Sequence, residues 1–464
     1  MSETVETDAN KPGETPPPKK QALILVHGMG EQVPMETLKG FVDTMWIHDP
    51  DIDARSDRDP PAQGNPIWWK PDPSTGSYEL SRITTREGHQ GARIGPRTDF
   101  FEFYWADLTE VNTLAQLKDW LMSLLWRRWS QVPNDVFSVW IILWLLTLSV
   151  GGLAIWHALA VAFGSTTPRW ANIAFSVLAL LYAVALPAVL GTFGDVAHYV
   201  RAKPANIAAR QAIRDRGLAL LRAITAKGEY SHIVLVGHSL GSIIAYDLIK
   251  LYWSECGAPR TMQQGDALYE ACVACDTAGG LLADPAYLEN YRAAQHRVFD
   301  AMQAVHAGEK APWLISDFVT LGSPLAHAQF LLAQDQDQLD RGQKDRRFPV
   351  CPPVSESADG FLYRPDRRNQ PDLWSMHHAA PFAAVRWTNI YDPSHGIIFG
   401  DMIGGSVTNP AGANFGRGIT DIPVTIRRAW ARPFDRFFTH TLYWTKTTKP
   451  SPQLEPLRKA LDLA

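Results

Sequence analysis

The chain has 464 residues, of which 46% are hydrophobic and 20% are charged, and its formal net charge is −4. A chain of this length and composition can bury a sizeable core, either in two or three domains or in one large domain with insertions. The charge balance lacks the basic footprint of a nucleic-acid-binding protein, so no nucleic-acid partner is expected.

The first residues are acidic, then rich in proline, and end in Lys19-Lys20. We expect a disordered tail over 1–20, and no signal peptide, because this segment has no apolar core of the required length. The four cysteines are too few for a disulfide framework and suit a reducing compartment. Cys272 and Cys275 form a lone C-x-x-C pair with no second pair nearby, so neither a metal nor a cofactor is predicted.

Five apolar runs alternate with helical patterns along the chain, and they predict an α/β fold with a doubly wound, mostly parallel sheet. The expected strands cover 21–26, 97–106, 232–236, 314–321 and 384–391. The clearest helical patterns cover 34–47, 204–226 and 242–253. We assign the two parts of this domain to 21–131 and 197–464.

The segment between these two parts contains two long stretches without charge, at 136–163 and 170–194. Each is longer than the roughly 20 residues that cross the hydrocarbon of a bilayer. They predict a transmembrane helical hairpin within 132–196, with the lipid bilayer as partner. The alternative is a pair of buried core helices, although core helices are seldom this long and apolar on every face.

Basic residues predict the orientation of the hairpin. The connecting loop has only Arg169, whereas both outer flanks are basic, with Lys118, Arg127 and Arg128 before the first stretch and Arg201, Lys203, Arg210 and Arg214 after the second. The positive-inside rule then places both flanks in the cytoplasm. We therefore expect an integral protein of the plasma or inner membrane whose main domain faces the cytoplasm.

The most informative motif is Gly237-His238-Ser239-Leu240-Gly241, which lies between an apolar strand and a helical pattern. This Gly-x-Ser-x-Gly spacing is typical of the strand-to-helix turn that exposes a nucleophilic serine. The two glycines are needed because strand and helix pass closely at a cramped backbone corner. The motif predicts Ser239 as a nucleophile.

Three further segments accompany this motif: His27-Gly28-Met29-Gly30-Glu31-Gln32 after the first strand, Gly322-Ser323-Pro324 after the fourth, and Thr439-His440-Thr441-Leu442-Tyr443-Trp444 near the end. With them the chain resembles the α/β-hydrolase superfamily, in particular its lipase-like and esterase-like serine hydrolases. The resemblance extends from about residue 21 to 446, apart from the hairpin and two long insertions. It implies an α/β-hydrolase fold that hydrolyses carboxylic esters.

A nucleophilic serine needs a histidine as base and a carboxylate that orients the histidine, in the chain order Ser, acid, His. The histidines after Ser239 that could serve are His327, His377, His378, His395 and His440. We favour His440, which lies beyond all five strands and matches the terminal His-x-x-Tyr-Trp pattern of the resembling proteins.

For the acid, the resemblance favours an Asp-x-Ile or Asp-x-Val context shortly after the fifth strand. Asp401 has this context, and Asp392 lies directly at the end of the strand. In the resembling proteins the acid usually lies a few residues after this strand, at a position that is His395 in this chain. We favour Asp401, with Asp392 as the alternative acid and another carboxylate such as Asp421 still open.

The oxyanion of the reaction needs two backbone N–H donors. Leu240, which follows the nucleophile, supplies one, and the resemblance implies Met29 for the other. The resemblance also implies that His27 and Gly28 brace the loop that carries Met29.

Two long insertions remain, 254–312 and 328–385. Long irregular segments in a compact domain are usually lids or binding loops. We expect both to hang from the sheet edge where the catalytic groups gather; the alternative is a solvated elaboration.

These expectations describe a membrane-anchored serine hydrolase that cleaves lipid or other acyl esters through Ser239, Asp401 and His440 and an acyl-enzyme. A catalytically inactive hydrolase-fold scaffold or interaction protein is the alternative, and the departure at His395 is its one hint in the sequence. A soluble enzyme whose apolar stretches form a cap or a dimer interface is a third possibility.

Overall fold

The structure is a computed structural model of the whole chain. It describes residues 19–28, 33–55, 64–77, 79–108, 126, 134–164, 167–180, 199–200, 204–256, 260–305, 313–356, 360–365, 372–395, 399–408, 414–429, 434–447 and 451–463. The predicted tail therefore lies almost wholly outside the described residues, and the first strand begins at Lys20.

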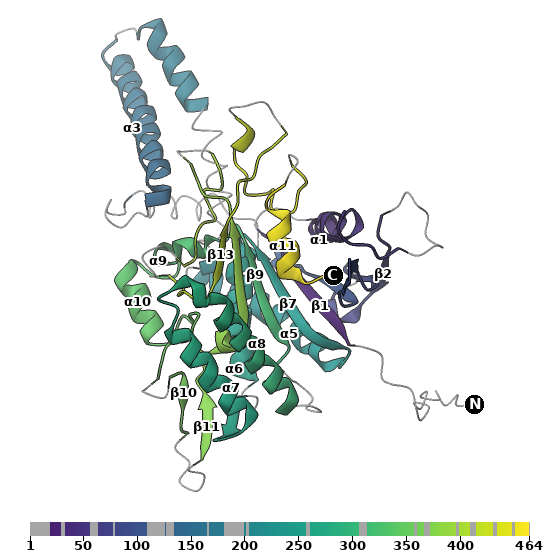
Figure 1. The fold of residues 1–464 in the computed structure, drawn as a ribbon. Coiled ribbons are helices and arrows are strands. Elements are labelled where there is room, and N and C mark those ends of the chain that lie inside the picture. The colour runs from purple at the N-terminus through teal and green to yellow at the C-terminus, as the bar shows by residue number, and fades with distance from the viewer. Residues whose placement is uncertain are drawn as a thin grey trace, which may run out of the picture.

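An eight-stranded sheet forms the centre of the molecule (Figure 1). Its strands, in order across the sheet, are β13 (Thr420–Pro423), β12 (Arg386–Tyr391), β9 (Ile315–Leu321), β7 (Tyr230–His238), β1 (Lys20–Val26), β6 (Thr98–Phe103), β3 (Ser81–Thr85) and β2 (Ile67–Pro71). The strands from β13 to β6 are parallel, and β3 and β2 add an antiparallel edge. The prediction of an α/β fold with a mostly parallel sheet is confirmed.

The central strands are apolar because both faces of the sheet are covered, as is usual for parallel sheets. In β1, Ile24 belongs to a core with helices α5 (Pro204–Ala226), α6 (Leu240–Glu255) and α8 (Leu288–Val305). Its neighbours Leu23 and Leu25 belong to a second core with α1 (Glu36–Val42) and α11 (Leu454–Leu461). Successive side chains of a strand point to opposite faces, so this alternation shows that helices cover both sides of the sheet.

The remaining elements are short or belong to the insertions. They are the π-helical turn η1 (Asp43–Ile47), the helices α7 (Ala267–Gly280), α9 (Ala328–Leu331) and α10 (Gln336–Lys344), the 3-10 turns η2 (Pro73–Thr75), η3 (Ala106–Leu108), η6 (Pro285–Tyr287), η7 (Pro324–His327), η8 (Pro381–Ala383) and η9 (Phe434–Arg436), and the strands β4 (His89–Gln90), β5 (Arg93–Ile94), β8 (Thr261–Gln263), β10 (Leu362–Tyr363) and β11 (Leu373–Met376).

The first insertion, 254–312, differs from the expected placement at the carboxyl ends of the strands, whereas the second, 328–385, leaves from the carboxyl end of β9 and crosses to the amino end of β12. Helix α6 starts at the carboxyl ends and runs back along the sheet, so 254–312 leaves and rejoins the sheet at the amino ends of β7 and β9. Strand β8 of this insertion pairs with β11 of the second, 328–385, in a small antiparallel sheet. Figure 1 shows β10 and β11 at the bottom of the molecule, away from the segment that follows β13.

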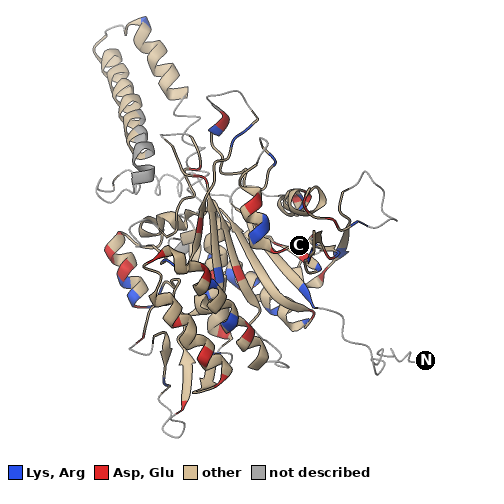
Figure 2. Cartoon of the chain, viewed as in Figure 1, with Lys and Arg blue, Asp and Glu red and all other residues tan. Residues whose placement is uncertain are grey.

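The first apolar stretch forms helix α3 (Asn134–Ala162), which projects from the sheet beside a second helix that includes residues 169–180 (Figure 1). The rings of Trp156 and Trp170 pack at 5.9 Å, and those of His157 and Phe175 at 5.4 Å, so the two helices are in contact. Apolar side chains such as Leu148, Ile155 and Leu159 are more than half exposed. Figure 2 shows the described part of the pair nearly free of charged side chains.

Within the described part of the chain, no helix is both long and apolar enough to qualify as a membrane span. In α3, the structure describes the side chains without interruption only from 147 to 162. Residues 181–194 of the second apolar stretch lie outside the described residues.

Candidate active site

Ser239 occupies a sharp corner between β7, which ends at His238, and α6, which begins at Leu240. Its backbone has φ 52° and ψ −130°. A positive φ is uncommon in a residue with a side chain, and strained residues of this kind cluster at functional sites. The Ser239 N–H donates to the carbonyl of Leu321 at 3.0 Å, which anchors the corner to β9.

The two glycines of the motif are required by this corner. A Cβ at Gly237 would lie 2.5 Å from the Cα of Ser242, and a Cβ at Gly241 would lie 2.2 Å from the carbonyl oxygen of Val26. Both distances are far below a van der Waals contact. The close approach of strand and helix therefore explains why the motif has glycine at both positions.

His440 is buried beside Asp401. Its Nδ1 lies 2.9 Å from both carboxylate oxygens of Asp401. A carboxylate can only accept, so Nδ1 carries a proton, and in the neutral form of the ring Nε2 is the nitrogen with the lone pair. Within the described part of the chain, neither His440 Nε2 nor Ser239 Oγ has a hydrogen-bond partner, although both atoms are buried.

The turn at Leu321 and Gly322 joins the serine to the histidine–aspartate pair. The Leu321 carbonyl accepts from the N–H of Ser239, and a Cβ at Gly322 would lie 3.1 Å from His440 Nδ1 and 2.7 Å from Asp401 Oδ2. The three predicted catalytic side chains thus gather at the carboxyl ends of β7, β9 and β12.

Asp401 is held as a charged carboxylate. Burial alone would raise its pKa, but the neighbouring His440, the Gly404 N–H and the Tyr443 hydroxyl outweigh burial and lower the pKa to about 2. The N–H groups of Ile403 and Gly404 donate to Oδ1 at 2.8 and 2.9 Å, and Tyr443 donates to Oδ2 at 2.6 Å. Such an anion is suited to orient His440 and to stabilise its protonated form.

The other carboxylates that the sequence left open have different partners. Asp392 accepts from the Arg436 guanidinium and from the Thr439 hydroxyl, each at 2.7 Å, and burial raises its pKa. Asp421 accepts from Asn389 and from two hydroxyl groups. Of the three, Asp401 is the one in contact with His440.

The loop after β1 is braced by His27. The N–H of Trp105 donates to His27 Nε2 at 3.2 Å, so Nδ1 carries the proton and donates to the Gly28 carbonyl at 2.9 Å. The ring stacks on Trp105, and burial lowers the pKa of His27 to about 4. A neutral His27 ring with a hydrogen bond at each nitrogen agrees with a role in bracing the loop rather than with proton transfer.

This braced loop reaches Ser239, because a Cβ at Gly28 would lie 3.0 Å from the Ser239 Cβ. Met29, the predicted second oxyanion donor, lies outside the described residues. Leu240 is the first residue of α6, and its N–H belongs to the first turn, where N–H groups have no acceptor within the helix.

Two residues near the site were not identified from the sequence as participants. His238 donates from Nε2 to the carbonyl of His440 at 2.9 Å, which connects the serine corner directly to the histidine loop. The Tyr443 hydroxyl accepts from the Asp392 N–H at 3.0 Å while it donates to Asp401. The pattern His-x-x-Tyr contained the second signal, since it places Tyr443 three residues after His440 in the same loop.

Replacing Tyr443 with phenylalanine is expected to lower the free energy of unfolding by about 1–3 kcal/mol at neutral pH, because a buried carboxylate and a buried N–H each lose a partner. Asp401 contributes stability above the pKa of the unfolded state, near 4, and this contribution is lost as the pH falls toward 2. Without the hydroxyl the pKa of Asp401 rises, so the loss of stability between pH 5 and pH 2 becomes smaller. Urea unfolding of both proteins across this range measures the effect, and identical profiles would contradict it.

Compared with family models, with curated protein sequences and with solved structures, the chain has no match. Among the described residues, no group of three or more His, Cys, Asp and Glu side chains is arranged to hold a metal ion.

Proposed function

We propose that the protein is a serine hydrolase that cleaves carboxylic esters through Ser239, His440 and Asp401. One observation carries the proposal: His440 is oriented by a buried, charged Asp401 at 2.9 Å, next to a serine on a strained strand-to-helix corner. This combination of a nucleophile, a base and an orienting carboxylate, in the order Ser, Asp, His, is the one that α/β-hydrolases use.

The proposed reaction follows from the hydrogen-bond roles. Ser239 Oγ attacks the ester carbonyl while His440 Nε2 takes the hydroxyl proton, and the protonated ring then delivers that proton to the departing alkoxide. The resulting acyl-enzyme is hydrolysed when His440 removes a proton from water, which attacks the acyl carbon and restores Ser239. Asp401 remains ionised and stabilises the imidazolium in both steps.

The oxyanion of each tetrahedral intermediate requires donors that already point at it. We assign one to the Leu240 N–H, at the start of α6, where the helix dipole also favours negative charge. We assign the second to the Met29 N–H, on the loop that His27 braces and that touches the Ser239 Cβ through Gly28.

We further propose that the sheet and these loops form an α/β-hydrolase domain, and that α3 and the helix after it anchor this domain to a membrane. The exposure of Leu148, Ile155 and Leu159 on a helix that projects from the sheet supports an apolar environment for this hairpin. A cytoplasm-facing site close to a bilayer favours lipid or other acyl esters as substrates. Release of the full-length protein from membranes by alkaline carbonate would argue instead for a cap or a dimer interface.

Labelling with a fluorophosphonate probe tests the catalytic proposal. Wild-type protein should react, and Ser239→Ala should lose the label, because the probe bonds only to an activated serine. Ser254→Ala, a change at an exposed serine on the same helix, is the control and should label like wild type. If wild type labels no more than Ser239→Ala, the inactive scaffold replaces the enzyme as the better explanation.

A further inference from the structure

A cavity of about 730 Å³ lies beside the nucleophile helix, outside the proposed catalytic site. Its walls come from 199–200, from α5, from the part of α6 between Ile243 and Lys250, and from the segment 330–348. Ile243, on the α6 wall, follows Ser239 by one helical turn. The cavity is thus separate from Ser239 but close to it along the same helix.

The polar wall of this cavity is strongly basic. Among the described residues, four cationic side chains line it, Arg210, Arg214, Lys250 and Arg347, against the single carboxylate of Asp247. Asp247 is already shared, since it binds Arg214 at 2.5 Å and Lys250 at 3.4 Å. The cavity therefore holds a surplus of positive charge that its own carboxylate does not balance.

Arg210 carries much of this surplus. Its guanidinium lies over the Tyr199 ring, at 5.6 Å, next to Arg214 over the same ring at 5.8 Å. No carboxylate pairs with Arg210 in the described part of the chain, and its Nε is buried without an acceptor. The Nε of Arg214 is likewise buried without an acceptor. Two guanidinium groups held over the same ring, each with an unused donor, fit an anion that accepts from both.

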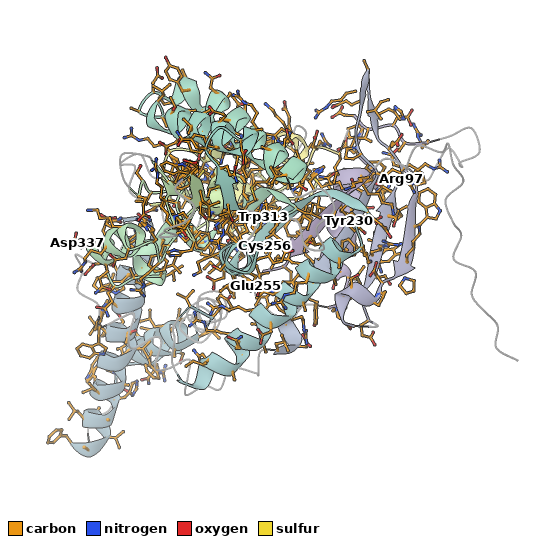
Figure 3. The ribbon with its side chains drawn as sticks, turned by 90° about the horizontal axis from the view of Figure 1, so that it is seen from below. Arg97, Tyr230, Glu255, Cys256, Trp313 and Asp337 are labelled. Atoms are coloured by element: carbon orange, nitrogen blue, oxygen red, sulfur yellow. The ribbon has the colours of Figure 1, made fainter. Side chains whose placement is uncertain are left out.

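Four apolar side chains also line the cavity: Phe330, Leu331, Leu332 and Phe348. Phe330 and Leu331 belong to α9, which lies near the end of α3 closer to the sheet in Figure 1; in Figure 3, Asp337 marks the adjacent helix α10. A cavity lined by both basic and apolar side chains suits a ligand with a phosphate at one end and a hydrocarbon chain at the other.

We propose that this cavity binds an anionic phospholipid, with the phosphate held by the neighbouring Arg210 and Arg214 and the acyl chain along the apolar side chains. Arg347 and Lys250, which also line the cavity, add positive charge for the phosphate. Basic pockets next to membrane-spanning helices bind anionic lipid headgroups in this way. The binding requires no turnover at Ser239, so it can fail or succeed independently of the proposed hydrolase activity.

Calorimetric titration of the detergent-solubilised, full-length protein tests this assignment. The probes are di-O-hexyl phosphatidic acid, di-O-hexyl phosphatidylcholine and inorganic phosphate, because ether chains cannot be hydrolysed. The phosphatidic acid should bind at least about tenfold more tightly than either other probe. Arg210→Gln and Arg347→Gln should each weaken its binding about tenfold or more, since a hydrogen bond to a charged group is worth that much.

Arg297→Gln is the matched control, because Arg297 is an exposed arginine on α8 outside the cavity, and it should bind like wild type. Arg347 is itself exposed, so Arg347→Gln tests the site even if Arg210→Gln unfolds. Equal binding of the two lipids, or wild-type affinity in Arg347→Gln, would overturn the basic site. Equal affinity for inorganic phosphate and the phosphatidic acid would overturn the lipid as ligand.

Discussion

Asp401→Asn is expected to lower kcat for a p-nitrophenyl ester by roughly 10⁴-fold, with a much smaller change in KM. Both carboxylate oxygens lie 2.9 Å from His440 Nδ1, so the aspartate fixes the tautomer that leaves Nε2 free to take a proton. An asparagine amide can turn its NH₂ toward the ring, favour the wrong tautomer and no longer stabilise the imidazolium. Losing this function in a serine triad costs about 10⁴ in kcat.

Asp392→Asn is the matched control, because Asp392 is equally buried and lies at the same end of the sheet. Its partners are Arg436 and Thr439, so its charge holds the loop before His440 and not the ring itself. We expect a loss of about 1–3 kcal/mol in the free energy of unfolding and less than about a tenfold change in kcat. Intact turnover in Asp401→Asn together with abolished turnover in Asp392→Asn would reverse the assignment.

The choice between these two aspartates shows which features of this site can be predicted from the sequence. The aspartate of the Asp-x-Ile context has a physical basis, because Asp401 Oδ1 accepts from the backbone N–H groups of Ile403 and Gly404. Hydrogen bonds between residues close in sequence can be predicted from a local pattern. The contact between Asp401 and His440 cannot, because it depends on how two loops fold over β12 and on the Tyr443 hydroxyl between them.

The same distinction explains which strands could be predicted. The five central strands have both faces buried, so they read as apolar runs and were found from the sequence. Strand β2 has four exposed residues among five, and β13 is a half-buried Thr-Asp-Ile-Pro segment. These edge strands were missed, because their pairing with distant segments, such as Thr388 with Thr420, outweighs a weak local pattern.

The placement of the first insertion could not be predicted for a related reason. The sequence indicates that 254–312 is a long and partly helical insertion, but it does not indicate whether this segment leaves the sheet at the amino or the carboxyl ends of the strands. The point of departure follows from the direction of α6, which starts at Leu240, directly after Ser239, and ends near the amino ends of the strands. Trp253, near that end of α6, donates to the His377 carbonyl of the other insertion, so the two insertions meet at the end of the helix that is far from Ser239.

Gly241→Ala is expected to lower the free energy of unfolding by about 3 kcal/mol or more. The added methyl would lie 2.2 Å from the carbonyl oxygen of Val26 and 2.5 Å from that of His27. Both are backbone atoms at the end of β1, a central strand paired on both sides, so neither can move without breaking the sheet. Overpacking against rigid neighbours falls at the upper end of the usual 1–3 kcal/mol range or beyond it.

The same substitution should also abolish fluorophosphonate labelling, because relief of the clash moves α6 away from the loop that His27 braces and displaces Ser239 from His440. Gly280→Ala is the control, since a methyl at the end of α7 would meet no atom within 4 Å. In a helix this change should leave stability equal or raise it by up to about 1 kcal/mol. Equal urea midpoints for Gly241→Ala and Gly280→Ala would show that strand and helix do not pass as closely as the strained corner at Ser239 requires.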